Sequence, residues 1–217
     1  MIQGIFQEEG LTLIIKNKRH LEMLLSKVKD FRSPKFELQQ YMTPSSIAAL
    51  IMWIAYQSGH IENQIVCDLG SGTGILCIAA ALMGARKVIG VEIDREAVNI
   101  AMENLKLFPE VSDRIEFKIM DIQNFKERVD TVVMNPPYGE KPLHLDRSFL
   151  EKAFEISDVI YSIHTIGSRD FLEKFSKKRG FQSSLLYIID FPIKWRFKWH
   201  KKPIYRFKAG IWRFTRF

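Results

Sequence analysis

The sequence predicts an α/β fold with a doubly wound, mostly parallel sheet of seven strands that ends in an antiparallel hairpin. Three observations predict it. Short apolar runs alternate with segments of helical period from residue 65 onward, a glycine-rich turn follows the first run, and the last two runs have no helix between them. Hydrophobic residues make up 47% of the 217 and charged residues 26%, which is typical of a globular protein.

The N-terminal part is expected to be helical. Residues 17–31 show the apolar spacing of an amphipathic helix, which a Ser-Pro pair ends. Thr43 and Pro44 predict the start of a second helix, with the Thr43 hydroxyl as its cap and the proline in its first turn. We therefore expect an N-terminal extension over residues 1–45 that covers a ligand site, and one catalytic domain over residues 46–217.

The alternation that follows defines the sheet. Strands are expected at residues 65–68, 87–93, 115–120, 131–134 and 159–163, and helices at 75–83, 95–107, 149–157 and 169–178. Two final runs, residues 184–189 and 204–215, alternate as antiparallel strands do. Strand–helix alternation implies a parallel sheet with helices on both faces, and the final pair implies a hairpin at one edge.

Charge and cysteine content narrow the class of partner. The net charge is +7, and residues 191–217 contain nine Lys or Arg but no Asp or Glu, which favours a polyanionic partner, most often nucleic acid. Cys67 and Cys77 lie in apolar runs without a companion cluster, so we expect buried thiols, no metal and a reducing, cytoplasmic location. No stretch approaches the ~18 apolar residues of a membrane span, and the N-terminus lacks the basic start of a secretory signal.

A glycine-rich turn over residues 68–74 (DLGSGTG) follows the first predicted strand. Glycines allow a tight turn and the close approach of a ligand to the backbone. The pattern G-x-G-x-G, opened by Asp68, departs from the G-x-G-x-x-G of dinucleotide-binding proteins. It resembles the first motif of class I S-adenosylmethionine methyltransferases, in which this loop meets the amino-acid end of the cofactor.

Two further acids, Glu92 and Asp121, follow the next two strands. A carboxylate at the position of Glu92 can accept both hydroxyls of a ribose. In the resembled class, the acid at the position of Asp121 takes the adenine amino group, and the backbone of the next residue, here Ile122, meets the ring. The carboxyl ends of parallel strands meet at one edge of a sheet, so these acids and Asp68 are expected to share one site.

Asn135-Pro136-Pro137-Tyr138 comes directly after the fourth predicted strand. Its prolines stiffen the loop and leave carbonyls free to face a substrate. An exocyclic amine is a poor nucleophile because its lone pair is delocalised into the ring. Hydrogen bonds from its N–H groups to the Asn135 side-chain oxygen and the Pro136 carbonyl would turn the nitrogen towards sp³, and Tyr138 offers a surface on which the base stacks. The tetrapeptide predicts methylation of a planar nitrogen, and it leaves adenine, cytosine and glutamine open.

The chain resembles the small-subunit ribosomal RNA adenine-N6 methyltransferases and their archaeal relatives over most of its length from about residue 20. The segments that carry the resemblance are residues 36–44 (FELQQYMTP), 68–74, 92–97, 134–139, 159–164 (VIYSIH) and 197–202 (FKWHKK). Eukaryotic members often have Phe where this chain has Tyr138, and small residues such as Cys in place of Ser71 and Thr73. Neither departure removes a needed group.

The resemblance implies S-adenosyl-L-methionine as cofactor and roles for particular residues. Gln40 and Thr43 would close over the cofactor, and Glu92 would hold its ribose. Asn135, Pro136, Pro137 and Tyr138 would be catalytic. The remaining residues expected to bind the cofactor are Asp68, Gly70, Gly72, Thr73, Ile75, Asp121 and Ile122.

Two macromolecular partners are expected. The basic, aromatic residues 194–202 favour RNA contact through Lys198, His200, Lys201 and Lys202, whereas the alternating residues 204–217 favour core strands. His164, which follows a buried run, either caps a strand or lines the substrate cleft. Members of the resembled family work with a small zinc-binding activator protein (Trm112-like), which implies a heterodimer through the edge strand at residues 115–120.

Three functions compete. The first is N6-methylation of one adenosine in small-subunit ribosomal RNA. The second is glutamine-N5 methylation of release factors, for which the roughly 45 residues ahead of the core are few for a docking domain. The third is a non-catalytic RNA-binding assembly factor, which would require a degenerate cofactor loop or a lost Asn135, and both are intact.

Overall fold

One seven-stranded sheet organises the computed structural model, which describes residues 15–35, 37–137, 145–194 and 204–217. The strands are β1 Ile65–Leu69, β2 Lys87–Glu92, β3 Ile115–Ile119, β4 Thr131–Met134, β5 Val159–Thr165, β6 Phe181–Lys194 and β7 Ile204–Arg216. Their order is β3-β2-β1-β4-β5-β7-β6, and only β7 runs antiparallel to its neighbours β5 and β6. The predicted fold class is therefore confirmed, including the hairpin at one edge.

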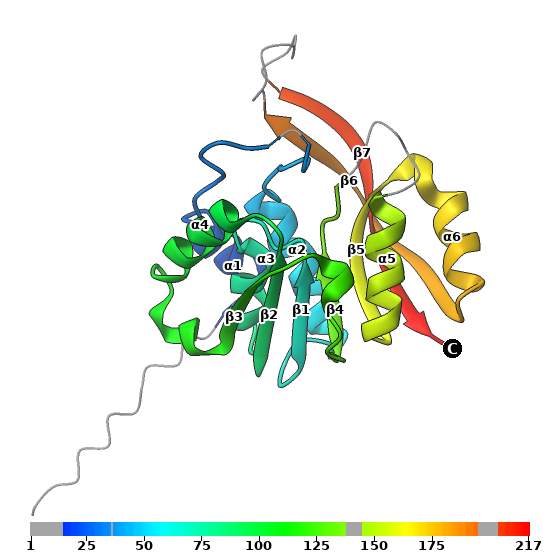
Figure 1. The fold of residues 1–217 in the computed structure, drawn as a ribbon, viewed down its shortest axis with the longest axis horizontal. Helices are drawn as coiled ribbons and strands as arrows, with labels where there is room; N and C mark the ends of the chain where they lie inside the picture. Colours follow the sequence, from blue (N-terminus) through cyan, green and yellow to red (C-terminus); the bar gives the residue numbers. More distant parts are fainter. Residues whose placement is uncertain (1–14, 36, 138–144, 195–203) are drawn as a thin grey trace, which may run out of the picture.

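Helices cover both faces of the sheet (Figure 1). One face carries α1 Lys18–Leu25, α2 Ser45–Gln57, α3 Ile75–Leu82 and α4 Arg95–Leu105, and the other carries α5 Leu145–Ile156 and α6 Arg169–Lys177. The 3-10 turns are η1 Pro109–Arg114, η2 Ile122–Asn124 and η3 Ile166–Ser168. Successive residues of β1 divide between the two hydrophobic cores, since Val66 belongs to the first and Cys67 to the second. A strand buried on both faces reads as a continuous apolar run.

The first helix is shorter than predicted. It ends at Leu25, although the apolar spacing continues to residue 31. Val28 is buried without a helix, because the buried Asn104 binds the backbone on both sides of Lys29: its Oδ1 accepts from the Lys29 N–H (2.8 Å) and its Nδ2 donates to the Lys29 carbonyl (3.0 Å). The apolar spacing after Leu25 therefore reflects tertiary contacts, although the sequence alone predicts a longer helix.

The prediction that Thr43 caps α2 is wrong. The cap position is Pro44, with no side-chain capping bond, and the helix begins at Ser45. The Thr43 side chain is buried and contacts Asn135 instead. The division of the chain at residue 45 stays a prediction, although Leu21 and Leu25 of α1 lie in the same hydrophobic core as α2 and α3.

The hairpin is longer than predicted. β6 pairs with β7 from Phe181 opposite Arg216 to Lys194 opposite Ile204, with an irregularity between Leu185 and Tyr187. The irregularity lies within the predicted range 184–189, and the strand continues past both ends of that range. The expectation that the last strand contributes to the core is confirmed by its buried residues, Ala209, Ile211, Trp212 and Phe214.

Strand β3 lies at the opposite edge of the sheet, as predicted. Its Glu116 pairs with Lys87 (2.9 Å), and its Lys118 pairs with Glu127. Ile119 remains 40% exposed. The edge therefore combines charged side chains with one exposed apolar residue.

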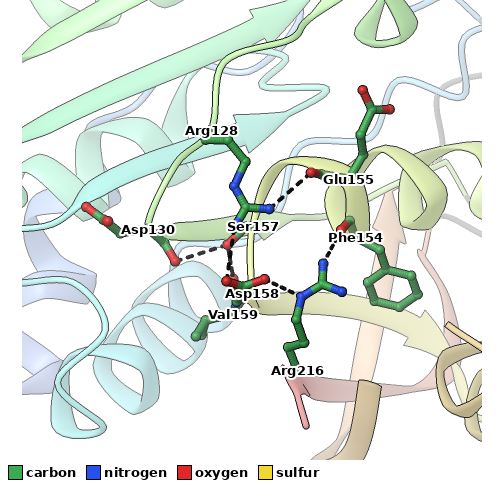
Figure 2. A network of polar contacts seen from close by, with 8 residues as sticks. All are labelled: Arg128, Asp130, Phe154, Glu155, Ser157, Asp158, Val159 and Arg216. Atoms are coloured by element: carbon green, nitrogen blue, oxygen red, sulfur yellow. Dashed lines mark hydrogen bonds and ion pairs between the residues drawn. The ribbon is translucent and has the colours of Figure 1, made fainter. Parts of the chain in front are cut away.

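A network of charges closes the other end of the sheet, where β4 and β5 begin (Figure 2). Asp158 accepts hydrogen bonds from Arg128 of the loop before β4 (2.9 Å) and from Arg216 near the C-terminus. Arg216 also donates to the Phe154 carbonyl of α5 (2.9 Å), and Ser157 donates to the Asp130 carbonyl (3.0 Å). The network joins the end of β7 to the α5–β5 turn.

Within the described part of the chain, no helix is long and apolar enough to cross a membrane. The same residues contain no cluster of three or more His, Cys, Asp or Glu side chains that could hold a metal ion. Cys67 and Cys77 are buried free thiols, as predicted.

Candidate active site

A cavity of about 370 Å³ opens at the carboxyl ends of β1, β2 and β4. Three segments far apart in the sequence form its walls: residues 37–43, the glycine-rich loop and the start of the loop after β4. Each residue expected to bind the cofactor lines it: Gln40, Thr43, Asp68, Gly70, Gly72, Thr73, Ile75, Glu92, Asp121 and Ile122. The fold thus brings together residues that are up to 82 positions apart, from 40 to 122.

The glycine-rich loop forms the floor of the cavity. Gly70 and Gly72 have positive φ values of 72° and 52°, which side chains rarely adopt. A Cβ atom on Gly70 would lie 2.9 Å from the Phe149 ring, and one on Gly72 would lie 2.9 Å from the Phe31 ring. Both glycines are therefore required by backbone conformation and by the aromatic residues that close over the loop.

Glu92 ties the end of β2 to this loop. Its Oε2 accepts from the Gly72 N–H (2.8 Å), and its Oε1 accepts from the backbone N–H groups of Ile93 and Asp94 (2.9 Å each). Burial raises the pKa of the Glu92 carboxyl, and the three backbone hydrogen bonds oppose that rise. Oε1 already accepts two hydrogen bonds and Oε2 accepts one, so acceptor capacity for a hydroxyl group of a ligand remains on Oε2.

Asp68 is the most buried acid of the cavity, with 2% of its surface exposed. Its Oδ2 accepts a long bond from the Cys77 thiol (3.5 Å), and its Oδ1 has no hydrogen-bond partner among the described residues. Burial raises the pKa of Asp68 to about 7. A buried carboxylate oxygen without a donor is costly, so this atom suits a ligand that carries N–H groups, such as an ammonium.

Asp121 and Ile122 stand at the end of β3. The Asp121 side chain caps the short η2 turn by accepting from the Gln123 N–H (2.9 Å), and Ile122 is buried beside it. Asp121, Ile122 and Gln123 all line the cavity. The turn thus presents a carboxylate beside an apolar surface, which suits an aromatic ring with a polar edge.

The loop after β4 reaches the cavity from the other side. Asn135 and Pro137 line the cavity, while Pro136 is buried and is not among the lining residues. The Asn135 Nδ2 donates to the Thr43 hydroxyl at 3.0 Å. Tyr138, the last residue of the predicted catalytic set, lies outside the described residues, as do Lys198, His200, Lys201 and Lys202.

The alternatives offered for His164 are wrong. The residue lies within β5, is fully buried, and shares a 2.7 Å hydrogen bond with the Ser162 hydroxyl. It does not line the cavity. Both residues are fully buried within β5, between β4 and β7, so this polar pair belongs to the core.

Sequence analysis missed a clasp at the mouth of the cavity. Asp94 accepts from the Gln40 amide (2.7 Å) and from the Lys35 ammonium (2.8 Å), while the Lys35 N–H donates to the Gln40 Oε1 (2.8 Å). Asp94 also caps α4 by accepting from the Glu96 N–H (3.1 Å). An Asp before a helix predicts the cap, but nothing in the sequence links it to residues 54 or more positions away.

Comparisons with known proteins place this cavity in context. The family model described as Ribosomal protein L11 methyltransferase (PrmA) matches residues 46–136. The match begins with α2 and ends in the loop after β4, so it covers the parallel strands β1 to β4 and the glycine-rich loop. It covers less than half of the chain and leaves out the hairpin.

Two longer similarities cover most of the chain. The chain is 35% identical to the rRNA N(6)-adenosine-methyltransferase Mettl5 of Drosophila melanogaster over 90% of its own length and 95% of that protein. It is 44% identical to PH1948 of Pyrococcus horikoshii, a candidate RNA methyltransferase, with a TM-score of 0.86 and coverage of 94% of this chain and 99% of that one. Both similarities extend over far more of the chain than the family model does.

A shorter similarity bears on the glutamine alternative. A protein of Methanocaldococcus jannaschii named as an N5-glutamine methyltransferase is 39% identical over 79 residues, which is 36% of this chain and 39% of that protein. A match of this extent is expected for enzymes that share a cofactor module and differ in the parts that select a substrate.

Proposed function

Because the chain belongs to the rRNA N(6)-adenosine-methyltransferase family, we propose that it methylates the N6 atom of one adenosine in small-subunit ribosomal RNA. The enzyme is an S-adenosylmethionine-dependent methyltransferase. The observation that carries the proposal is the position of Asn135: its amide stands at the wall of a cavity lined by Asp68, Glu92 and Asp121. An amide beside such a cavity can hold an amine in line with a bound methyl donor.

In this proposal each acid of the cavity binds a different group of the cofactor. Glu92 would accept the ribose hydroxyls, Asp121 the adenine amino group, and Asp68 a hydrogen bond from the ammonium. The unpartnered Asp68 Oδ1 supports this fit, because it is a buried acceptor in need of a donor. When bound, the cofactor supplies a methyl group already activated by its sulfonium.

The protein then supplies alignment. The Asn135 side-chain oxygen and the Pro136 carbonyl would accept the two N–H groups of the adenine amine, and Tyr138 would stack on the base. This alignment would place the amine nitrogen in line with the methyl group that the bound cofactor would supply, so that the nitrogen could accept it. The nitrogen afterwards loses a proton to water, so no strong general base is required. The target adenosine must be unpaired or flipped out to reach the cavity.

Two contacts complete the proposed assembly. RNA would bind Lys198, His200, Lys201 and Lys202, whose cations suit phosphate groups. A small zinc-binding activator protein (Trm112-like) would extend the sheet at residues 115–120. The position of β3 at the sheet edge and the exposed Ile119 support this second contact, since an uncovered edge strand is a site for strand addition.

A labelling experiment tests the proposal. The purified chain, with and without the zinc-binding protein, is given tritiated cofactor together with small-subunit ribosomal RNA or release factor, and the product is digested and identified. We expect N6-methyladenosine at a single position of the RNA. Label in a glutamine of release factor, with silent RNA, would contradict the proposal and favour the glutamine enzyme that shares the cofactor module.

A further inference from the structure

Residues 37–43 form a strap across the cavity, since all seven of them line it. Two of its side chains make hydrogen bonds to distant parts of the chain. The Gln40 side chain is tied to Asp94 at the start of α4, and the Thr43 side chain is tied to Asn135 in the loop after β4. The first anchor reaches an acid just outside the cavity lining, and the second reaches a residue of the lining itself.

The second anchor holds the side-chain amide of Asn135. Thr43 is buried, with 5% of its surface exposed. Its hydroxyl accepts a hydrogen bond from the Asn135 Nδ2, which lies 92 positions away in the sequence. A primary amide can turn by 180° about its last bond and exchange its oxygen for its nitrogen. A hydroxyl can accept from Nδ2 or donate to Oδ1, so the bond holds the plane of the amide. In the orientation seen here the hydroxyl accepts from Nδ2, and Thr43 leaves the Asn135 Oδ1 to face a substrate.

The hydroxyl has no other task that the fold requires. Helix α2 begins without a side-chain cap, so the Thr43 oxygen is not used to start the helix. Loss of this oxygen should therefore leave α2 intact, whereas it removes the atom that orients Asn135.

We infer that Thr43 is a positioning residue that presents the Asn135 oxygen to the substrate amine and makes this presentation depend on a seated strap. The inference rests on the proposed function, because the oxygen matters only if a substrate N–H must be accepted. It also gives the strap two separable roles: the Gln40 anchor retains the cofactor, and the Thr43 anchor aligns the acceptor.

Three variants test the inference. Thr43→Val keeps the shape and removes the hydroxyl, Thr43→Ser keeps the hydroxyl, and Ser46→Ala removes an exposed hydroxyl in the first turn of α2 as a matched control. We expect Thr43→Val to lower kcat by about 10²-fold, as misplaced groups do. The Kd for the cofactor should rise much less than kcat falls, because the valine side chain still lines the cavity where Thr43 does. Thr43→Ser should restore most of kcat, and Ser46→Ala should keep it.

A second measurement does not depend on activity. The side-chain amide protons of Asn135, assigned in NMR spectra by their loss in Asn135→Ala, should exchange slowly with water in the wild type and in Thr43→Ser, and rapidly in Thr43→Val. Rapid exchange in the wild type would overturn the inference, and so would an unchanged kcat in Thr43→Val or a loss of cofactor binding equal to the loss of kcat.

Failure of the proposed function looks different. If the labelled product is not N6-methyladenosine, the proposed substrate is wrong, and kcat of the same variants is then measured on the acceptor that carries the label. An unchanged kcat of Thr43→Val on that acceptor would overturn the inference as well, whereas the same loss would support it for a different planar nitrogen.

Discussion

Two carboxyl groups at opposite ends of the sheet are held in opposite ways. Asp68, at the cavity end, is buried, and its Oδ1 has no hydrogen-bond partner among the described residues; burial raises its pKa to about 7. Asp158, at the other end, is 49% exposed in its side chain and is paired with Arg128 and Arg216. The Arg216 hydrogen bond, followed by the charge of Arg128, holds the pKa of Asp158 below its ordinary value.

This difference between Asp68 and Asp158 indicates that one carboxyl group serves ligand binding and the other serves stability. A buried acid without a donor costs folding free energy, and the cost is recovered only when a ligand brings the donor. A paired, partly exposed acid adds a little stability and offers nothing to a ligand. Changes at the cavity end should therefore alter binding and catalysis most, and changes at the opposite end should alter unfolding alone.

The largest expected effect is at Asn135. Asn135→Ala removes the proposed acceptor of the amine, so we expect kcat to fall by about 10²- to 10³-fold, the range seen when one group that stabilises a transition state is lost. Cofactor binding should survive, because Glu92 and the glycine-rich loop are held by backbone hydrogen bonds that do not involve Asn135. Methyl transfer and calorimetric cofactor binding measure the two quantities.

Either of two results would contradict the role proposed for Asn135 at the cavity end of the sheet. Near wild-type methyl transfer by Asn135→Ala would show that the amine is not aligned by this side chain. A matching loss of cofactor affinity would instead assign Asn135 to the cofactor site, and Tyr138 and the Pro136 carbonyl would then have to align the base without it.

The cavity end was also the easier end to predict from the sequence. Asp68, Glu92 and Asp121 each follow a strand of a parallel sheet, so their convergence is a consequence of topology. The contacts of Asp94 with Gln40, and of Thr43 with Asn135, join segments without a shared period or motif. The local pattern Thr-Pro predicts a helix cap at Thr43. The hydroxyl instead bonds Asn135, and this tertiary contact cannot be predicted from the residues around Thr43.

Asp68 predicts a pH dependence of intermediate size. Its folded pKa of about 7 lies above the ordinary value of 3.8, so its contribution to stability is complete below pH 3.8 and is lost as the pH rises through 7. Without cofactor, the free energy of unfolding should therefore fall by up to about 1.4 kcal/mol per pH unit from this group between about pH 5 and 7. Asp68→Asn cannot ionise and should lack this slope in urea unfolding.

Cofactor binding should show the opposite trend. An ammonium favours the ionised form of Asp68, so wild-type affinity should weaken as the pH falls below 7, while the affinity of Asp68→Asn should be weaker overall and less dependent on pH. Equal slopes for the two proteins, in unfolding and in binding, would show that Asp68 is already ionised in the empty cavity and that the contrast with Asp158 is one of pairing only.

The smallest effect is expected at Asp158, where the sign is reversed. Its lowered pKa contributes stability that is present above the ordinary value of 3.8 and is lost as the pH falls through the folded pKa. Because the Asp158 and Arg216 side chains are 49% and 41% exposed, solvent screens the pair, and Asp158→Asn should cost only about 0.5–1 kcal/mol of unfolding free energy at pH 7. This loss of stability in Asp158→Asn should shrink in acid, where the wild-type carboxyl is protonated, and in high salt.

Methyl transfer by Asp158→Asn should be unchanged. The network lies where β4 and β5 begin (Figure 2), whereas the cavity lies where β4 ends. A variant that unfolded normally but methylated slowly would mean that the two ends of the sheet are coupled, and that the charges around Asp158 do more than join β7 to the α5–β5 turn.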